Sequence, residues 1–469
     1  MKHFHNIIAF AFLLIFSASI LAQEDAVDTY VRSQIGSLHI PGISVAIVRN
    51  GQVVKAKGYG LANVELNVPA AKNTVYELGS IGKQFTATAV MMLVEEGKIN
   101  LDDKITKYFA GAPEYWNKIT IRHLLTHTSG IQNHVAVPGY LKIFKTDITF
   151  ETTPAREEIL KEFFKLPKEF EAGETWAYDN TGYYLLGFVI EKASGKNYYQ
   201  FLDERIFKPL AMNSTRSTDP RNIVPNRASG YEWVNNKFEN RPALLPTIAF
   251  SAGTIISTVE DMGKWDAALY TEKLLKKSSL EQIWTPARAN DGTLASFDYG
   301  FGWFIYSYQN HRFVQHSGGT PGFSTVFYRF PDDKLSVVIL TNHADRFLDQ
   351  FAIDIAGIYA PALKRPEGKT DPEPKTSLKL KEAMSGLMNG KYDAELFTPP
   401  MRAFLKSSTG KGFWQWAAYH GALTSFAFSN SEDAGDSRTL RYKVGLGNNS
   451  YWFSLRVMND GKIAQIYWW

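Results

Sequence analysis

The order of apolar and polar residues predicts a helix and a β-hairpin near the start of the chain. Residues 24–35 place apolar side chains on one helical face, and this spacing ends before Pro41-Gly42. Two strand-like runs follow, Ile43–Val48 and Gln52–Lys57. Because Asn50-Gly51 between them is a favoured two-residue hairpin turn, the runs predict a pair of antiparallel strands.

Strand-like runs return towards the end of the main domain. Ser324–Phe330 and Ser336–Thr341 are joined by Pro331-Asp332-Asp333, and Phe347–Tyr359 has the spacing of a closing helix. The stretch between the two sets of strands is mostly helical and looped in pattern. Two strands before this stretch and three after it predict a five-stranded, mainly antiparallel sheet with the terminal helices on one face, an α/β (α+β) fold.

A charged, proline-containing stretch at residues 363–377 has the composition of a linker. Residues 378–469 contain a helical run and then alternating runs, which predict a small α+β module. Its tryptophans could form a stacking platform for sugars or for another protein, but aromatic residues at strand spacing more often belong to a core. The tryptophans in question are Trp414, Trp416, Trp452, Trp468 and Trp469. The role of this module does not follow from its residues.

Residues 1–22 have the three parts of a signal peptide. Lys2 supplies the positive start, Ile7–Phe16 the apolar core, and Ser17–Ala22 the small-residue end. The apolar run is short for a membrane span, which makes a single membrane anchor the weaker alternative. We therefore expect cleavage near Ala22 and a periplasmic or secreted protein, with no stable membrane span in the mature form.

The composition excludes several classes of function. The chain has 469 residues, 45% of them hydrophobic, which is enough for a sizeable core and for two domains. Its net charge of +4, without a lysine- and arginine-rich block, gives no indication of a nucleic-acid partner. The absence of cysteine excludes disulfides, thiolate catalysis and cysteine-ligated metals. No cofactor motif is present, and we expect no cofactor.

The candidate nucleophile is Ser80, in a segment Ser80-Ile81-Gly82-Lys83 that stands between a strand-like run and an apolar helical run. In the first turn of a helix this spacing brings the Ser80 hydroxyl and the Lys83 amine within hydrogen-bond reach. A neutral lysine can take the serine proton, which requires its pKa to fall by about 3 units, or roughly 4 kcal/mol. Taken alone, the pair is more simply an N-cap serine followed by an exposed lysine.

Two histidines four residues apart, His123 and His127, could share a helix face as metal ligands. Neither a zinc-protease motif nor a paired acidic ligand accompanies them. We therefore expect both histidines to be structural and no metal to be bound.

Two later segments bring further polar groups. Tyr178 has a phenol that can transfer a proton, and Asn180 has an amide that both donates and accepts hydrogen bonds. The simpler interpretation of this segment is aromatic packing at a helix entrance. The other segment is His316-Ser317-Gly318-Gly319, in which the glycines allow a substrate to approach the backbone closely and meet its N–H groups.

These motifs, Ser80-x-x-Lys83, Tyr178-x-Asn180 and His316-x-Gly318 in this order, resemble those of the serine β-lactamase and penicillin-binding protein family. The resemblance is strongest to the branch with class C β-lactamases, DD-peptidases and esterases, and it covers about residues 25–362. It implies a β-lactamase/transpeptidase-like fold and a serine hydrolase domain at residues 23–362.

The resemblance also implies a mechanism. Ser80 would attack a carbonyl with Lys83 as base, and Tyr178 would pass protons to the leaving group and activate the deacylating water. Asn180 would hold the substrate amide and the Lys83 amine. The backbone N–H groups of Ser80 and Gly319 would stabilise the oxyanion.

One position departs from the family pattern. His316 stands where β-lactamases and most DD-peptidases of the family have lysine. Because histidine is mostly neutral at neutral pH, it contributes less positive electrostatic potential than lysine. Ser317 keeps a hydroxyl that could still hold a carboxylate. The resemblance is therefore closer to the esterases, D-amino-acid amidases and peptidases that carry histidine here.

We expect an exported serine hydrolase that acts on a small-molecule ester, amide or peptide through a Ser80 acyl-enzyme. The alternative within enzymes is a DD-carboxypeptidase or β-lactamase that acts on peptidoglycan-like substrates. The alternative of another class is a protein that captures cell-wall peptides or penicillin without turnover. All three motifs contain chemically competent groups, which favours an enzyme.

Overall fold

The computed structural model describes residues 26–137, 139, 156–242, 246–344, 348–366 and 370–468. The predicted signal peptide lies outside these residues. Residues 26–37 are helical, which agrees with the predicted first helix over the part that is described. Across the described part of the chain, no helix combines the length and the apolar character needed to cross a membrane.

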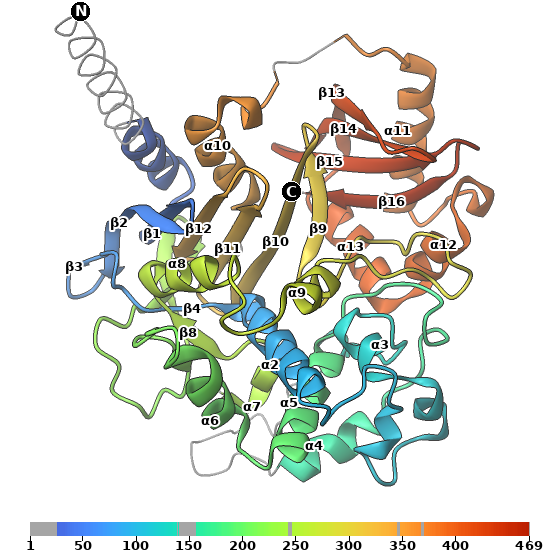
Figure 1. Ribbon diagram of the computed structural model, residues 1–469. Helices are drawn as coiled ribbons and strands as arrows, with labels where there is room; N and C mark the ends of the chain where they lie inside the picture. The colour runs from blue at the N-terminus through green and yellow to red at the C-terminus, as the bar shows by residue number, and fades with distance from the viewer. Residues whose placement is uncertain are drawn as a thin grey trace, which may run out of the picture.

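A seven-stranded sheet forms the centre of the protein, with the strand order β3-β2-β1-β12-β11-β10-β9 (Figure 1). Every neighbouring pair is antiparallel. The bounds are β1 Gly42–Arg49, β2 Gln52–Asn63, β3 Val68–Pro69, β9 Phe304–Tyr308, β10 His311–Thr320, β11 Phe323–Phe330 and β12 Leu335–Thr341. The antiparallel sheet is confirmed, but it has two strands more than the five expected. The short β3 extends one edge, and four strands rather than three follow the helical region.

The turn between β1 and β2 explains the register of the first hairpin. Asn50 and Gly51 both have positive φ, 53° and 72°, which matches the twist of the two strands. β1 then pairs on its other side with β12, so that Ile43 lies opposite Thr341. The start of the domain and its end are therefore joined at the middle of the sheet.

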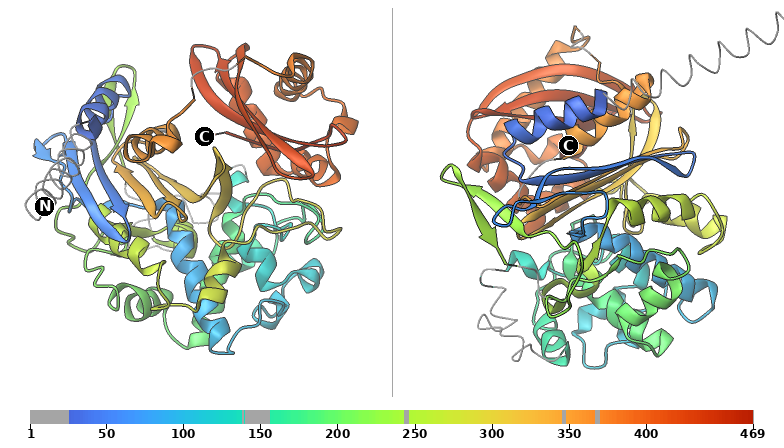
Figure 2. Two further views of the ribbon diagram at one scale, coloured as in Figure 1. Left: turned by 45° about the horizontal axis from the view of Figure 1, so that its top comes forward. Right: turned by 90° about the vertical axis from the view of Figure 1, so that its left-hand side faces the viewer.

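Helices cover both faces of the sheet (Figure 2). On one face, the helix at residues 26–37 and α10 (Asp349–Tyr359) pack against Val45, Val326 and Ile339. On the other face, α2 (Lys83–Glu95) and α8 (Val259–Ala268) pack against strand residues that include Phe327 and Leu340. Because both faces are covered, every residue of β11 and of β12 is buried, and the polar residues among them, such as Arg329, are buried as well.

The region between β2 and β9 is mostly helical, as expected. Its helices are α2 Lys83–Glu95, α3 Ile121–Leu125, α4 Arg156–Phe163, α5 Asn180–Ser194, α6 Tyr198–Leu202, α7 Pro246–Ala249, α8 Val259–Ala268 and α9 Lys277–Ile283. A small sheet joins β4 (Tyr76–Glu77), β8 (Ile255–Ser257) and β5 (Arg216–Ser217), and β6 (Gly230–Val234) pairs with β7 (Lys237–Arg241). Through the small sheet, β4, which precedes Ser80, pairs with β8, which lies far along the chain.

The C-terminal module consists of three helices and a four-stranded antiparallel meander. The elements are α11 Pro374–Met388, α12 Pro399–Lys406, α13 Ser408–Tyr419, β13 Leu423–Asp433, β14 Ser437–Leu446, β15 Asn449–Met458 and β16 Ile463–Trp468. The expected α+β module is present, and it includes a further strand, β13. The stretch predicted as a linker is helical from Pro374, where α11 begins.

The module is packed firmly against the main domain, beside the edge strand β9 (Figure 1). Phe404 of α12 contacts the Trp176 ring, with ring centroids 6.2 Å apart. Asp298 accepts a hydrogen bond of 2.8 Å from Gln465 and pairs at 2.7 Å with Arg456, whose side chain is 13% exposed. The two units therefore share an apolar cluster and a buried ion pair.

The Asp298 contacts predict that substitution at this interface destabilises the whole protein. Asp298→Ala leaves the Arg456 guanidinium buried without its carboxylate, which should lower the free energy of unfolding by about 3–5 kcal/mol. Urea unfolding measures this change. The control is Glu162→Ala, which removes an exposed pair with Lys165 and should cost less than about 1 kcal/mol. Equal effects of the two variants would contradict the prediction.

Candidate active site

Ser80 lies in a single 3₁₀ turn, Gly79–Gly82, that leads directly into α2. This continuous helical turn places Lys83 one turn after Ser80, and the Lys83 Nζ atom lies 3.1 Å from Ser80 Oγ. Lys83 is fully buried, whereas Ser80 is half-buried. The structure thus brings together the pair that the sequence predicted.

The Lys83 amine is surrounded by oxygen acceptors. It donates to Asn180 Oδ1 at 2.8 Å and to the Ala252 carbonyl oxygen at 2.7 Å. Burial lowers the pKa of Lys83 well below its usual value, and the Asp179 carboxylate partly opposes this change. A neutral amine has two N–H groups and one lone pair. With both N–H groups bound by Asn180 and Ala252, the lone pair is available to the Ser80 proton.

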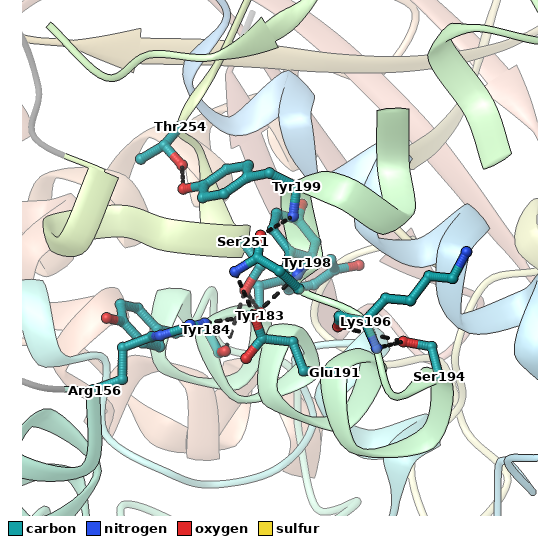
Figure 3. Close-up of polar contacts among 11 residues, drawn as sticks. Arg156, Tyr183, Tyr184, Glu191, Ser194, Lys196, Tyr198, Tyr199, Ser251 and Thr254 are labelled. Atoms are coloured by element: carbon teal, nitrogen blue, oxygen red, sulfur yellow. Dashed lines mark hydrogen bonds and ion pairs between the residues drawn. The ribbon is translucent and has the colours of Figure 1, made fainter. Parts of the chain in front are cut away.

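The segment that supplies the Ala252 carbonyl is held from two sides. Ser251 donates through its hydroxyl to the Tyr183 carbonyl oxygen of α5 at 2.8 Å, and its own carbonyl accepts from Thr86 of α2 at 2.7 Å. Tyr199 and Thr254 bond through their hydroxyls at 2.6 Å. Figure 3 shows the contacts around Ser251 and Tyr199. These contacts fix a backbone acceptor that no side-chain motif would reveal.

Tyr178 lies beside the Lys83 amine. Its ring centroid is 4.8 Å from Lys83 Nζ, and its hydroxyl is buried. Burial raises the pKa of the Tyr178 phenol above its usual value, although the nearby Ser80 side chain lowers this pKa in part. The ring of His127 packs on Tyr178 with centroids 4.5 Å apart, and His127 Nδ1 accepts from the Asp179 N–H at 3.1 Å. His127 therefore holds Tyr178 through its ring and through the backbone of the following residue, Asp179.

The two histidines weighed as metal ligands have structural contacts. His123 completes a capping box with Thr120 at the start of α3, and His127 packs on Tyr178 as described above. Within the described ranges, no group of three or more histidine, aspartate or glutamate side chains is placed to hold a metal ion.

Asp179 is a site residue that the sequence analysis missed. As the N-cap of α5 it accepts from the backbone N–H groups of Thr181 and Gly182, at 2.7 Å and 2.9 Å, and it thereby orients Asn180 at the first position of the helix. Burial raises the pKa of Asp179 to about 7 despite these bonds. Its position directly before an apolar helical run was the signal available in the sequence.

The His316 side chain lies behind the site. It is 2% exposed, and its Nδ1 lies 2.6 Å from the Ser317 carbonyl oxygen, which can only accept, so the proton is on Nδ1. Its Nε2 then accepts from the Tyr299 hydroxyl at 3.0 Å. Burial, together with the Lys83 charge, lowers the pKa of His316 to about 3. This histidine is therefore neutral at ordinary pH.

The glycines of β10 allow the strand to pass directly beside the Ser80 turn. A methyl group on Gly318 would lie 2.0 Å from the Leu78 carbonyl oxygen, and one on Gly79 would lie 2.7 Å from the Gly319 nitrogen. Gly79 also has a φ of +54°, which favours glycine. The backbone N–H of Gly319 therefore lies close to the turn that carries Ser80.

A cleft of about 1030 Å³ runs past this strand. Tyr178, Ser317, Gly318 and Gly319 line it, whereas the other side of the cleft is formed by residues of α12, α13 and β16. Because successive strand residues face opposite sides of a sheet, Ser317 faces the cleft while His316 lies behind it. The half-buried Ser80 and its buried partner Lys83 thus adjoin a space large enough for an organic substrate.

A model of the family named Beta-lactamase matches residues 27–357. The chain belongs to this family. The penicillin-binding protein 4* of Bacillus subtilis is 33% identical over 324 residues, which are 66% of this chain and 69% of that protein. The Beta-lactamase family assignment confirms the resemblance seen in the three motifs, and with it the chain is a serine hydrolase of the β-lactamase and penicillin-binding protein type.

Two solved structures extend the comparison. The octameric penicillin-binding protein homologue from Pyrococcus abyssi covers 93% of this chain and 96% of its own, with a TM-score of 0.62 and 24% identity, which bears on the fold alone. A D-stereospecific amidohydrolase from Streptomyces covers 69% of this chain and 94% of its own, with a TM-score of 0.54 and 27% identity. The Beta-lactamase family fold is therefore confirmed for the main domain, and the likeness to the Pyrococcus abyssi protein extends to the C-terminal sheet module.

The contacts of the β10 glycines generate a prediction for this member of the Beta-lactamase family. Gly318→Ala would push β10 away from Leu78, which should lower the free energy of unfolding by about 1–3 kcal/mol and slow acylation of Ser80 by about 100-fold. Urea unfolding and stopped-flow acylation measure the two effects. The matched control is Gly319→Ala, because no atom lies within 4 Å of the added methyl group and the stability should not fall. Equal stability losses in the two variants would refute the steric argument.

Proposed function

We propose that the chain is an exported serine hydrolase that cleaves an ester or an amide through an acyl-enzyme on Ser80. The observation that carries the proposal is the buried Lys83 amine, which donates to two carbonyl oxygens and lies 3.1 Å from Ser80 Oγ. A lysine in this environment serves as a base near neutral pH. The signal-like sequence of residues 1–22 supports export to the periplasm or the medium.

The proposed reaction begins when Lys83 takes the Ser80 proton and Ser80 Oγ attacks the substrate carbonyl. Tyr178 then passes a proton to the leaving group, and after its departure it helps to activate the water that releases the acid. Asn180 keeps the Lys83 amine in place and offers its amide nitrogen to the substrate. The Asp179 cap supports this arrangement because it fixes the start of α5.

The oxyanion is assigned to the backbone N–H groups of Ser80 and Gly319. The close approach of Gly79 to the Gly319 nitrogen supports this pairing. In other hydrolases, one such donor contributes roughly 3–4 kcal/mol to the lowering of the barrier. Both donors are backbone groups, Ser80 in the turn Gly79–Gly82 and Gly319 in β10, so little movement of the protein is needed when negative charge develops on the oxygen.

The environment of His316 supports an ester, amide or D-amino-acid substrate over a substrate that needs a cation in the site. The neutral imidazole bonds to Tyr299 and Ser317 and supplies no charge for a substrate carboxylate. Ser317 and Gly318 line the cleft and are the candidates for direct contact with the substrate. The likeness to a D-stereospecific amidohydrolase at 27% identity supports the amidase type.

Similarity to a penicillin-binding protein favours a second candidate, a DD-carboxypeptidase that acts on peptidoglycan fragments. A β-lactamase, or a protein that is acylated without turnover, would use the same Ser80 and Lys83. These alternatives differ from the first proposal in the acyl group and in the rate of deacylation. One acylation experiment with several substrates therefore separates them.

We predict a covalent adduct that depends on Ser80. Intact-mass spectrometry with a p-nitrophenyl ester, a β-lactam and a D-Ala-D-Ala peptide should detect an adduct or turnover with the wild-type protein and neither with Ser80→Ala. Lys83→Met should lower the acylation rate by about 10²- to 10⁴-fold, because the general base is lost. The control, Lys165→Met, removes an exposed lysine and should keep the wild-type rate.

Each outcome of this experiment decides between the candidates. The best substrate identifies the esterase, peptidase or β-lactamase type, and an adduct that persists without product release supports the non-turnover protein. An adduct on Ser80→Ala, or no adduct and no turnover with any of the three compounds, would argue against the proposed function.

The buried His316 generates a prediction about pH. His316→Ala removes the bonds to Tyr299 and Ser317 and should lower kcat/KM by roughly 5- to 10-fold, the equivalent of about 1 kcal/mol. Because the pKa of His316 is lowered to about 3, its protonation changes only well below pH 5. The pH profile between pH 5 and 9 should therefore keep its shape. An unchanged rate, or the loss of a limb near pH 6, would show that this role is wrong.

A further inference from the structure

The cleft beside Ser80 has one wall that the main domain does not supply. Residues of the C-terminal module line it opposite β10, among them Phe413 and Trp416 of α13, Tyr419 at the end of α13, and Trp468 of β16. We call these four residues the aromatic wall. The wall belongs to the same cleft as Tyr178 and Gly319, so a substrate bound at Ser80 can reach it.

Three rings of the aromatic wall are open to the cleft, because Trp416 and Trp468 are half-buried and Tyr419 is exposed. Phe413, by contrast, is buried and packs behind them in the core. Trp416 and Trp468 are stacked, with centroids 5.2 Å apart and planes at 8°, and Phe413 lies 3.7 Å from Trp468. Tyr419 is 87% exposed. Trp414 is 5% exposed, packs in the core and is not among the described residues that line the cleft. Half-buried and exposed aromatic rings along a cleft offer a face on which a planar apolar group can stack.

The position of the wall identifies the part of the substrate that it meets. Thr409 of α13 donates a hydrogen bond of 3.0 Å to the Tyr178 carbonyl oxygen, so the module adjoins the Tyr178 side of the site. Trp176, which contacts Phe404 of the module, also lies beside Tyr178, with ring centroids 6.3 Å apart. In the proposed reaction Tyr178 gives its proton to the leaving group, which must therefore depart on this side.

We propose that the aromatic wall binds the leaving-group portion of the substrate, and that this portion carries an aromatic or similarly large, planar apolar group. The inference rests on the proposed function, because the leaving group is located through the role of Tyr178. It assigns the module a part in substrate selection. The acyl portion, which stays on Ser80, does not contact the wall.

The test uses esters that share an acyl group and differ in the leaving alcohol. Methyl butyrate and 2-(2-naphthyl)ethyl butyrate both form butyryl-Ser80, and they release methanol and a naphthyl alcohol. Methyl 2-naphthylacetate carries the ring on the acyl side instead. The measured quantity is the preference ratio, kcat/KM of the naphthylethyl ester divided by kcat/KM of methyl butyrate, for the full-length protein.

The preference ratio should fall by about tenfold in Trp416→Ala and in Tyr419→Ala, because each removes a ring from the wall. Tyr419 is exposed, so its variant tests the proposal even where Trp416→Ala fails to fold. The matched control is Trp452→Ala, a half-buried tryptophan of the same module that lies beside Arg365 and is not among the described residues lining the cleft. It should keep the wild-type ratio.

Three results would overturn the inference. The first is an unchanged preference ratio in both wall variants, and the second is an equal fall of that ratio in Trp452→Ala. The third is that the wall variants lose as much activity with methyl 2-naphthylacetate as with the naphthylethyl ester. The rate at which butyryl-Ser80 is hydrolysed is a further readout. The leaving group has already departed at this stage, so only a general structural defect in a wall variant would lower this rate.

If the wild type shows neither an adduct nor turnover with these esters or with the p-nitrophenyl ester, the β-lactam and the D-Ala-D-Ala peptide, the proposed function fails and the inference fails with it. If it acts on any of these compounds but hydrolyses none of the butyrate esters, or hydrolyses them with an unchanged ratio, only the inference fails.

Discussion

The burial of the Lys83 amine is the constraint on which the rest of the site depends. An ammonium group removed from water is costly, and the described groups around this one are two carbonyl oxygens, a hydroxyl, the rings of Tyr178 and Tyr183, and Asp179, whose pKa burial raises to about 7. The protein satisfies the amine as a neutral group, which is also the form that accepts a proton from Ser80. The arrangement that makes burial tolerable therefore makes the base available.

This constraint explains why the surroundings are rigid. The Ala252 carbonyl must stay in place to keep one Lys83 N–H satisfied, and α2, α5 and the Tyr199 hydroxyl network all hold that segment. Asn180 must stay in place to satisfy the other N–H, and the Asp179 cap fixes it at the start of α5. The precision of the pair at Ser80 thus depends on Ser251, Tyr199 and Asp179, which have no part in the proposed contacts with a substrate.

The sequence was a good guide where chemistry and spacing coincide. The Ser80 and Lys83 spacing, the hairpin at Asn50-Gly51 and the helix entrance at Asn180 all follow from local rules. The Ala252 carbonyl could not be predicted, because any residue supplies a backbone acceptor. Strand β13 was missed because many of its side chains are polar and exposed. The sequence also could not predict which side of the module lines the cleft. A tryptophan at strand or helix spacing does not indicate which residues it contacts until the position of the module on the main domain is known.

The pairing of β1 with β12 has a consequence for how the protein folds. Ile43 lies opposite Thr341, so the centre of the sheet closes only when segments near the two ends of the main domain have met. Such contacts between distant segments carry a large entropic cost and form slowly. The meeting of β10 with the Ser80 turn depends on the same sheet, so catalytic competence arises late in folding.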